Sequence, residues 1–354
     1  MVALAYDRAL EAVNQAWLEI AEGRSIIDVE ETSAHVSTNR VFRLALSSGD
    51  SVVAKVSNYG SYFLFAEDHD RLFECTTLLA NSRWANFLAT VLTHDGRPYR
   101  WYDGKCWVVF YVDVPRAEML GGVVAESDID NLATEIAEFH AISQEVGNRL
   151  PPPSHSIRSD AVSLYDALGK SNAPTAFELS LSELDVVRRS VHELLIHLEA
   201  IDFDHWPKMP ILVDWNLGNF SIHRAASGRF SLFSRWDYDW FRIDTRMLDF
   251  YFLSRVSSKT GDKTSFTYSP HTLLEPRFVK FLATYHSSNH LREEEVRFLP
   301  WAYRFFILHY VIRDGAKFFQ PALIDRFKRE AVSSYLPTLS SFDCSSLLNV
   351  LERW

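Results

Sequence analysis

Cysteine is scarce in the sequence, and the cysteines that are present form no recognisable pattern. Cys75, Cys106 and Cys344 are the only three among 354 residues, and they lie far apart. Zinc sites and disulfide frameworks need close spacings or even numbers, so this usage is typical of a reduced, cytoplasmic protein. The histidines show no paired metal spacing either, which argues against a zinc site.

An excess of basic charge and long hydrophobic runs are also lacking. The 36 basic residues are outnumbered by 46 acidic ones, giving a formal net charge of -10. A nucleic-acid surface needs clustered Lys and Arg, so we expect no nucleic-acid partner. The apolar run over residues 305–312 is interrupted by His309, and we expect no membrane span. Residues 1–7 show no basic segment leading into an apolar run, so we expect no signal peptide.

Hydrophobic residues, in contrast, are plentiful at 47% of the chain. The length exceeds the size at which a single hydrophobic core usually stops growing. Two packed lobes or domains are therefore expected. The acidic balance leaves room for a cationic or polyhydroxylated ligand, and nothing in the composition indicates an oligomeric state.

The residue pattern of the first third of the chain predicts a small sheet with one or two helices. Helical spacing over residues 7–22 predicts an amphipathic helix. Two β-rich runs, 41–46 and 51–56, flank Ser-Ser-Gly-Asp and predict a hairpin. A second helix is predicted over residues 63–80, and short strands follow between 90 and 112. We expect residues 1–113 to form a β-rich lobe.

The remainder, residues 114–354, is predicted to be mainly helical. Helical periodicity is strong over residues 128–142 and 181–198, and it resumes from residue 246 apart from a polar loop at 257–270. A short β-like segment spans residues 211–237. A β-rich lobe followed by a helical lobe is an α+β architecture, and a cleft between two lobes is a common ligand site.

One set of polar residues carries chemistry. Asp214 and Asn219 form an Asp-x-x-x-x-Asn motif, and Asp237 follows after a turn-rich connection. Asp249 comes twelve residues later, and Lys55 lies upstream within a predicted strand. Phosphoryl transfer needs such groups: hard oxygens for Mg²⁺, a carboxylate to orient the acceptor hydroxyl, and a lysine to hold phosphates.

The order of these motifs resembles the aminoglycoside phosphotransferase, choline kinase and type II homoserine kinase family. The matching pieces are Asn39–Arg43, Ile136–Ala141, Leu212–Asn219, Trp236–Asp239 and Asp249. They run in sequence order over more than half of the chain, and the ordered set is far more specific than any single piece. The resemblance implies a two-lobed, protein-kinase-like fold and ATP-dependent phosphorylation of a small-molecule hydroxyl.

The resemblance also implies roles for the residues of the larger lobe. Asp214 matches the catalytic base, and Asn219 and Asp237 match the Mg²⁺ ligands. ATP and Mg²⁺ are therefore the expected cofactors. Asp249 is expected to brace the catalytic loop through hydrogen bonds, and His140 is expected to be a satisfied helix histidine.

In the smaller lobe, Lys55 matches the lysine that anchors the phosphates. Glu74 is the expected acidic partner of Lys55, with Glu67 as the alternative. Main-chain groups around Tyr111 and Val112 are expected to bind the edge of the adenine.

Two departures from the family pattern leave alternative functions open. Leu212 replaces a histidine two residues before the catalytic aspartate, and the bulky Trp236 precedes the metal aspartate. A catalytically weak or inactive pseudokinase that binds nucleotide as a scaffold is the main alternative. A protein-directed kinase is disfavoured, because the sequence has no Asp-Phe-Gly metal loop and no Ala-Pro-Glu segment.

The acceptor is predicted only by class. Acidic residues near the site, including Asp239 and Asp244, favour an amine-bearing alcohol such as an amino-sugar, amino alcohol or hydroxy amino acid. The helical regions 150–205 and 255–330 are expected to set specificity. Aromatic residues crowd the site loops, and packing is their favoured role over cation binding; they are Trp215, Trp236, Tyr238, Trp240 and Phe241.

Overall fold

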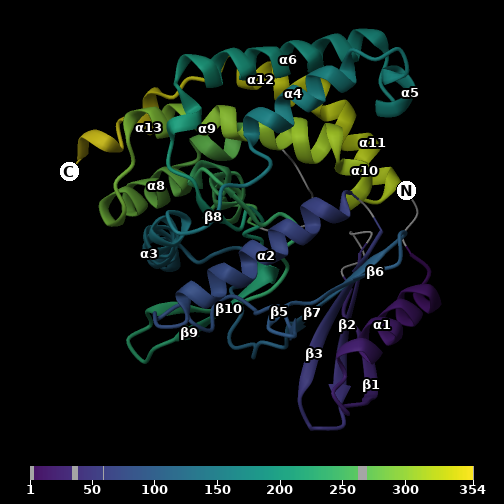
Figure 1. Cartoon of the computed structure of the whole chain (residues 1–354). Coiled ribbons are helices and arrows are strands. Elements are labelled where there is room, and N and C mark those ends of the chain that lie inside the picture. The colour runs from purple at the N-terminus through teal and green to yellow at the C-terminus, as the bar shows by residue number, and fades with distance from the viewer. Residues whose placement is uncertain (1–3, 34–38, 59, 262–268, 354) are drawn as a thin grey trace. The chain divides into compact units, whose positions relative to one another are not determined.

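The computed structural model describes residues 4–33, 39–58, 60–261 and 269–353. Its chain, coloured from purple at the N-terminus to yellow at the C-terminus in Figure 1, forms two compact units. The N-terminal unit comprises Met1–Pro115, Ser234–Trp236 and Ala316–Leu323, and the C-terminal unit comprises Arg116–Phe233, Asp237–Gly315 and Ile324–Trp354.

The N-terminal unit is built on a five-stranded antiparallel sheet with the order β1-β2-β3-β7-β6. The strands are β1 (Ile26–Glu31), β2 (Arg40–Leu46), β3 (Ser51–Ser57), β6 (Arg100–Tyr102) and β7 (Trp107–Val112), beside a small β4 (Thr93–His94) and β5 (Arg97–Pro98) ladder. The predicted hairpin is confirmed as β2–β3, and Gly49 adopts a φ of +88° in its turn, a conformation that costs glycine little.

Helix α1 (Tyr6–Ile20) covers one face of this sheet (Figure 1). Its apolar stripe, which includes Val13 and Trp17, packs on alternate residues of the strands such as Phe42 and Phe110. The alternation follows from the two-residue period of a strand, which sends successive side chains to opposite faces. Lys55, between Ala54 and Val56 of this core, therefore points to the other face.

Helix α2 (Tyr62–Leu79) contacts that other face. Phe65 of α2 packs against Trp107, and the His69 Nε2 lies 2.6 Å from the Tyr111 hydroxyl oxygen. Lys55 is buried on this side, and together with burial its charge lowers the pKa of His69 to about 3. His69 is therefore a neutral histidine at physiological pH.

The C-terminal unit is mainly helical. Its helices are α3 (Ile129–Gly147), α4 (Ile157–Leu168), α5 (Ala173–Phe177), α6 (Leu181–Ala200), α7 (Phe250–Val256), α8 (Pro276–Ser288), α9 (Glu293–Phe306), most of α11 (Pro321–Glu330), α12 (Leu336–Ser340) and α13 (Ser345–Leu348). Most of α10 (Gly315–Phe318) and the first residues of α11 belong to the N-terminal unit. Helix α3 packs against α8, and α4 packs against α6. Ser180 and Glu183 form a capping box that fixes the start of α6.

Two short antiparallel pairs complete this part of the chain. β8 (Met209–Ile211) pairs with β11 (Arg242–Asp244), with Ile211 opposite Arg242. β9 (Phe220–Arg224) and β10 (Phe230–Arg235) form a hairpin (Figure 1). These pairs account for the β-like segment predicted at residues 211–237.

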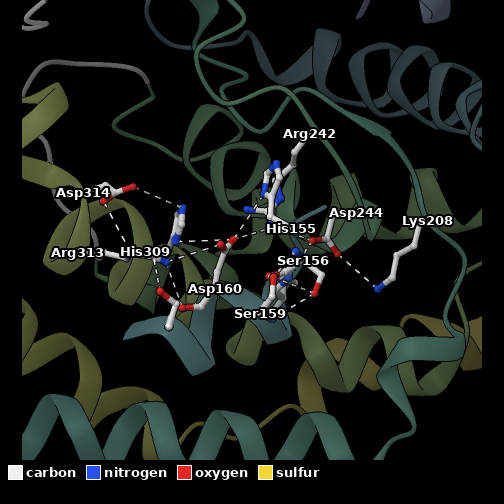
Figure 2. A network of polar contacts seen from close by, with 12 residues as sticks. His155, Ser156, Ser159, Asp160, Lys208, Arg242, Asp244, His309, Arg313 and Asp314 are labelled. Atoms are coloured by element: carbon white, nitrogen blue, oxygen red, sulfur yellow. Dashed lines mark hydrogen bonds and ion pairs between the residues drawn. The ribbon is translucent and has the colours of Figure 1, made fainter. Parts of the chain in front are cut away.

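A buried ionic network ties β11 to the surrounding helices (Figure 2). Arg242, which is 2% exposed, donates to the carboxylates of Asp160 and Asp244 at 3.0 and 2.9 Å. Asp244 also accepts from the Ile157 N–H at 3.2 Å, and His309 lies 3.8 Å from Asp160. A buried charge is tolerated when it is paired and hydrogen-bonded, and the two carboxylates pair with Arg242, although its Nε makes no hydrogen bond among the described residues.

The α+β class predicted from the sequence is confirmed, with a small antiparallel sheet and a larger helical part. The predicted helices at 63–80 and 181–198 correspond to α2 and α6 within two residues. Part of the predicted polar loop at 257–270, residues 262–268, lies outside the described residues. In the part of the chain that the structure describes, no helix is long and apolar enough to cross a membrane.

Candidate active site

Two loops of the C-terminal unit leave the same end of the β8–β11 pair. Ile211, the last residue of β8, lies opposite Arg242, the first residue of β11. The loop with Asp214 follows β8, and the loop with Asp237 and Asp239 precedes β11. In an antiparallel pair the end of one strand adjoins the start of its partner. The strand pairing therefore brings together two loops that are separated along the chain by the β9–β10 hairpin.

The backbone just before Asp214 is tightly turned. Val213 has a φ of +57°, which is unfavourable for a β-branched residue. The Asp214 N–H donates to the Leu212 carbonyl at 2.6 Å, and the Trp215 N–H donates to the Val213 carbonyl at 3.1 Å. Such conformations cost about 1–3 kcal/mol and persist where surrounding contacts impose them.

Asp249 supplies those contacts. Its Oδ1 accepts the Val213 N–H at 2.6 Å, and its Oδ2 accepts the Trp215 indole N–H at 2.8 Å. The same Oδ2 lies 2.9 Å from Nε2 of His140, whose Nδ1 lies 2.8 Å from the Tyr285 hydroxyl. Asp249 and His140 are fully buried. The bracing role predicted for Asp249 is confirmed, as is that of His140 as a satisfied helix histidine.

Asp214 itself is half-buried and stands at the start of a compact loop. Its Oδ1 accepts the Asn216 N–H at 3.1 Å, and its main-chain oxygen accepts from Asn219 Nδ2 at 3.5 Å. The Asn219 N–H donates to the Asn216 carbonyl at 2.9 Å. The Asp-x-x-x-x-Asn motif is thus one hydrogen-bonded unit, and its spacing lets Asn219 fold back on Asp214.

The β9–β10 hairpin relates Asn219 to Asp237. Asn219 immediately precedes β9, and Asp237 comes two residues after Arg235, the last residue of β10. Both therefore lie at the open end of the hairpin. Asp237 has a φ of +69°, and its Oδ1 accepts the Asp239 N–H at 3.3 Å.

These two residues fit a magnesium ion by their chemistry. Carboxylate and amide oxygens are hard ligands of the kind that Mg²⁺ prefers. Among the described residues, no group of three His, Cys, Asp or Glu converges on a metal position. A Mg²⁺ ion held by one or two protein oxygens together with substrate phosphates needs no such group.

The N-terminal unit holds the other predicted residues, and Lys55 is buried there in β3. Glu74 is exposed on α2, on the side away from buried Leu72 and Cys75, and this position does not suit a partner of a buried lysine. Glu67 forms an ion pair with Arg71 one turn further on.

The main chain at Tyr111 and Val112 pairs with neighbouring strands and segments of the N-terminal unit. Val112 pairs with β3, and its N–H donates to the Thr90 carbonyl at 2.9 Å. Tyr111 pairs with Val53 on one side and bridges Val91 on the other. Adenine binding by main-chain groups around these two residues stays a prediction.

Asp244 corrects a further expectation. It is completely buried, and its carboxylate is occupied by Arg242, the Ile157 and Thr245 N–H groups, and Lys208. Asp244 therefore holds the fold together and does not face an amine-bearing substrate.

Packing is confirmed as the role of four of the aromatic residues near the site loops. Each of the four is at most 8% exposed: Trp215, Tyr238, Trp240 and Phe241.

Sequence reasoning missed His69 and the Arg242–Asp160 pair. His69 shares a helix face with buried Leu72 and Thr76, so helical spacing alone could have placed it against the sheet. Asp160 and Arg242 are separated by 82 residues. No local pattern signals that pairing.

The sheet order, the braced loop after β8 and the loop before β11 agree with the protein-kinase-like fold of small-molecule kinases. No family model matches the chain, and no curated protein matches its sequence. Solved structures do match in fold. A microcompartment-associated aminopropanol kinase has a TM-score of 0.59 at 17% identity, covering 96% of this chain and 99% of its own.

Two further structures agree with this assignment. An amicoumacin kinase in complex with AMP-PNP and Ca²⁺ has a TM-score of 0.60 at 13% identity, covering 97% of this chain and 100% of its own. A Plasmodium vivax ethanolamine kinase has a TM-score of 0.53 at 12% identity, covering 96% and 85%. The likeness at these identities establishes the fold, and it confirms the fold that the sequence resemblance predicted.

Proposed function

We propose that this protein is an ATP-dependent phosphotransferase that moves the γ-phosphate to a hydroxyl of a small molecule. The observation that carries the proposal is the convergence of the Asp214 and Asp237 loops at one end of the β8–β11 pair. The bracing of the first loop by Asp249 adds support, because it holds Asp214 in one conformation without any ligand. Phosphoryl transfer depends mainly on such positioning.

In the proposed mechanism, Asp214 accepts a hydrogen bond from the acceptor hydroxyl and takes its proton. The hydroxyl oxygen forms a bond to the γ-phosphorus as the bond between that phosphorus and the β–γ bridging oxygen breaks, and ADP leaves. Asn219 and Asp237 would hold the Mg²⁺, which supplies charge stabilisation to the phosphates. Lys55 would contribute its positive charge to the phosphates from β3.

The nucleotide base is assigned to a different segment from the one that the sequence suggested. Because Tyr111 and Val112 are committed to the sheet, we assign adenine recognition to the main chain of residues 113–115. The acidic partner of Lys55 is assigned to the first turns of α2, where Glu67 lies, and not to exposed Glu74.

The proposed acceptor is an alcohol that carries an amine. Two neighbours in fold are an aminopropanol kinase and an ethanolamine kinase by name, and both names denote amino alcohols. Asp239, which is half-buried in the loop before β11, is the remaining acidic candidate for the amine now that Asp244 is assigned to the network. We propose a cytoplasmic setting, with neither nucleic acid nor membrane as a partner.

The pseudokinase alternative rests on Leu212, which replaces the histidine of the family pattern. Leu212 is buried, and the loop beside it is braced through Asp249, His140 and Trp215. The hydrogen bonds among these residues therefore support the loop although the family histidine is absent, and this favours an active enzyme.

The test is ATP turnover with matched acceptors. The protein is incubated with Mg²⁺-ATP and pairs of alcohols that differ only by an amine, and products are identified by phosphorus NMR. We expect phosphate esters of the amino alcohols and at least tenfold slower turnover of the amine-free partners. Preferred turnover of amine-free alcohols would contradict the acceptor class. Nucleotide-dependent thermal stabilisation with no turnover of any acceptor would favour the pseudokinase.

A further inference from the structure

A cavity lies within the C-terminal unit, among α3, α9 and the segment around β8. It has a volume of about 250 Å³ and is lined by polar and aromatic residues. Those that carry the argument are Gln144, Trp206, Arg246, His290, Arg292 and Glu295. None of them belongs to the loops that hold Asp214 and Asp237. The cavity is large enough for several water molecules or one small organic anion.

The one acidic residue of this lining is already saturated. Glu295 accepts from Arg246 Nε and Nη2, both at 2.8 Å, and from the Arg292 N–H at 2.9 Å. Burial opposes its ionisation, but Arg246 outweighs burial and lowers the pKa of Glu295. The Glu295 carboxylate therefore stays charged and has no need of a further cation.

Arg292, in contrast, has only long ion pairs within the described part of the chain, with no carboxylate oxygen within hydrogen-bond distance of its guanidinium. Its guanidinium stands 5.0 Å above the Trp206 ring, and its nearest carboxylate oxygens, on Glu294 and Glu295, are 3.7 and 3.6 Å away. Among the described residues the guanidinium donates no hydrogen bond. Ion pairs at these distances on a half-exposed side chain contribute little. Its directional donors are therefore available to a ligand.

Other donors converge on the same space. The Gln144 side-chain amide, from α3, has no hydrogen-bond partner in the part of the chain that the structure describes, and it lines the cavity. Arg292 is the N-cap of the 14-residue helix α9, whose first-turn N–H groups point toward this end, although its first turn also carries Glu293 and Glu294. Two arginines against one glutamate leave the lining with an excess positive charge of one.

We propose that this cavity binds a small anion, a carboxylate or a phosphate, with Arg292 and Gln144 as its principal donors. A planar guanidinium matches the paired oxygens of either group. The face of Trp206 orients that guanidinium and borders the space in which the rest of the ligand would lie. This binding site is separate from the proposed site of phosphoryl transfer and does not depend on that proposal.

A continuous set of contacts leads from this site to the braced loop. Arg246, whose Nη1 lies 3.4 Å from the Tyr285 hydroxyl, forms the cavity wall. Tyr285 contacts His140, and His140 contacts Asp249, which accepts the Val213 N–H. An anion that fixes the position of the α9 N-terminus and Arg246 should also steady the Val213 amide.

Binding is tested by calorimetric titration of the full-length protein with inorganic phosphate and, separately, with acetate, at constant ionic strength. The test variant is Arg292→Gln, and the matched control is Arg297→Gln, which removes the same charge from an exposed position of the same helix. We expect saturable binding to wild type and control, weakened about tenfold or more in Arg292→Gln, as for loss of one charge-assisted hydrogen bond.

Each outcome has a defined meaning. Binding of phosphate alone identifies a phosphate-bearing ligand, binding of acetate alone identifies a carboxylate, and binding of both supports the shared anion chemistry. No saturable binding of either probe, or equal binding by the two variants, overturns the site. Hydrogen exchange of the peptide spanning residues 209–217 tests the coupling. Protection of that peptide by the bound anion in wild type, but not in Arg292→Gln, supports it, and binding without protection overturns it.

Discussion

The carboxylate of Asp249 accepts the main-chain N–H of Val213 at 2.6 Å. This one bond links a residue at the start of α7 to the strained position immediately before Asp214. A positive φ at a valine is unfavourable by itself, so the bond and its companion from Trp215 fix the direction in which the Asp214 side chain leaves the chain. Asp249 therefore acts through Asp214 and is a positioning residue.

Replacing Asp249 by Asn should lower kcat much more than it changes the KM for ATP. The neutral amide offers only one acceptor oxygen where the carboxylate offers two, and a misplacement of about 1 Å can cost about 10²-fold in rate. We expect a 10- to 100-fold loss of kcat and a destabilisation of about 1–3 kcal/mol from the unsatisfied buried group. Steady-state kinetics and urea unfolding measure the two effects.

The control for this prediction is Asp343→Asn, which alters an exposed aspartate that accepts hydrogen bonds from the nearby Ser345. It should leave kcat unchanged. A kcat for Asp249→Asn within twofold of the wild-type value would show that the Val213 contact does not position Asp214.

Asp237→Asn should raise the Mg²⁺ concentration needed for half-maximal activity. The charged ligand is lost while the shape of the loop is kept, and loss of a metal-site contact typically costs 10- to 100-fold in metal affinity. A titration of activity with Mg²⁺ at saturating ATP measures the shift. Asp239→Asn serves as the comparison and should shift the titration less. The reverse order of effects would move the metal ligand to Asp239.

Lys55→Met should weaken ATP binding while leaving the fold intact. The methionine keeps most of the buried side-chain volume in β3 but removes the charge that we propose holds the phosphates. We expect at least a tenfold rise in the KM for ATP, which corresponds to about 1.4 kcal/mol. Lys105→Met, on an exposed turn, is the matched control. Unchanged ATP binding in the Lys55 variant would remove this lysine from the nucleotide site.

Stability should fall as the pH drops below about 6.5. Burial lowers the pKa of His309 to about 4 and, with the Lys55 charge, that of His69 to about 3. The unfolded chain binds protons at these groups near pH 6.5, whereas the folded chain does not, so their stabilisation is complete above 6.5 and declines as the pH approaches 4. We expect a loss of about 1–2 kcal/mol per histidine between pH 7 and pH 5.

Urea unfolding across this pH range measures the dependence. His309→Gln should flatten the curve, and His192→Gln, at an exposed position of α6, should leave it unchanged. A wild-type stability that is constant between pH 7 and pH 5 would contradict this account of the buried histidines.

The sequence predicted the elements better than it predicted their partners. The hairpin β2–β3 and helix α6 are set by local periodicity and turn chemistry, and both were located within two residues. The bracing role of Asp249 was predicted through the family resemblance, because its spacing from Asp237 is part of an ordered motif. Glu74 as the partner of Lys55, with Glu67 as the alternative, stays a prediction, because helical spacing alone does not give that pairing.

The rest depends on long-range pairing that no local pattern contains. The Val112 N–H donates to the Thr90 carbonyl, and that contact is fixed only by sheet assembly. Asp244 was assigned to substrate because of its charge, whereas the structure buries it against Arg242 and Lys208. Charged residues near a motif can stabilise the fold or bind a ligand, and burial decides between these roles.

The most direct test of the proposed function is the Asp214→Asn variant. Its rate of transfer to the best amino alcohol acceptor and its affinity for Mg²⁺-ATP are measured beside those of the wild type. If Asp214 is the catalytic base, the rate falls at least 10²-fold, as for loss of general-base catalysis, while nucleotide affinity changes less than threefold. A variant that phosphorylates the acceptor as fast as the wild type would contradict the assignment of Asp214 and, with it, the proposed mechanism.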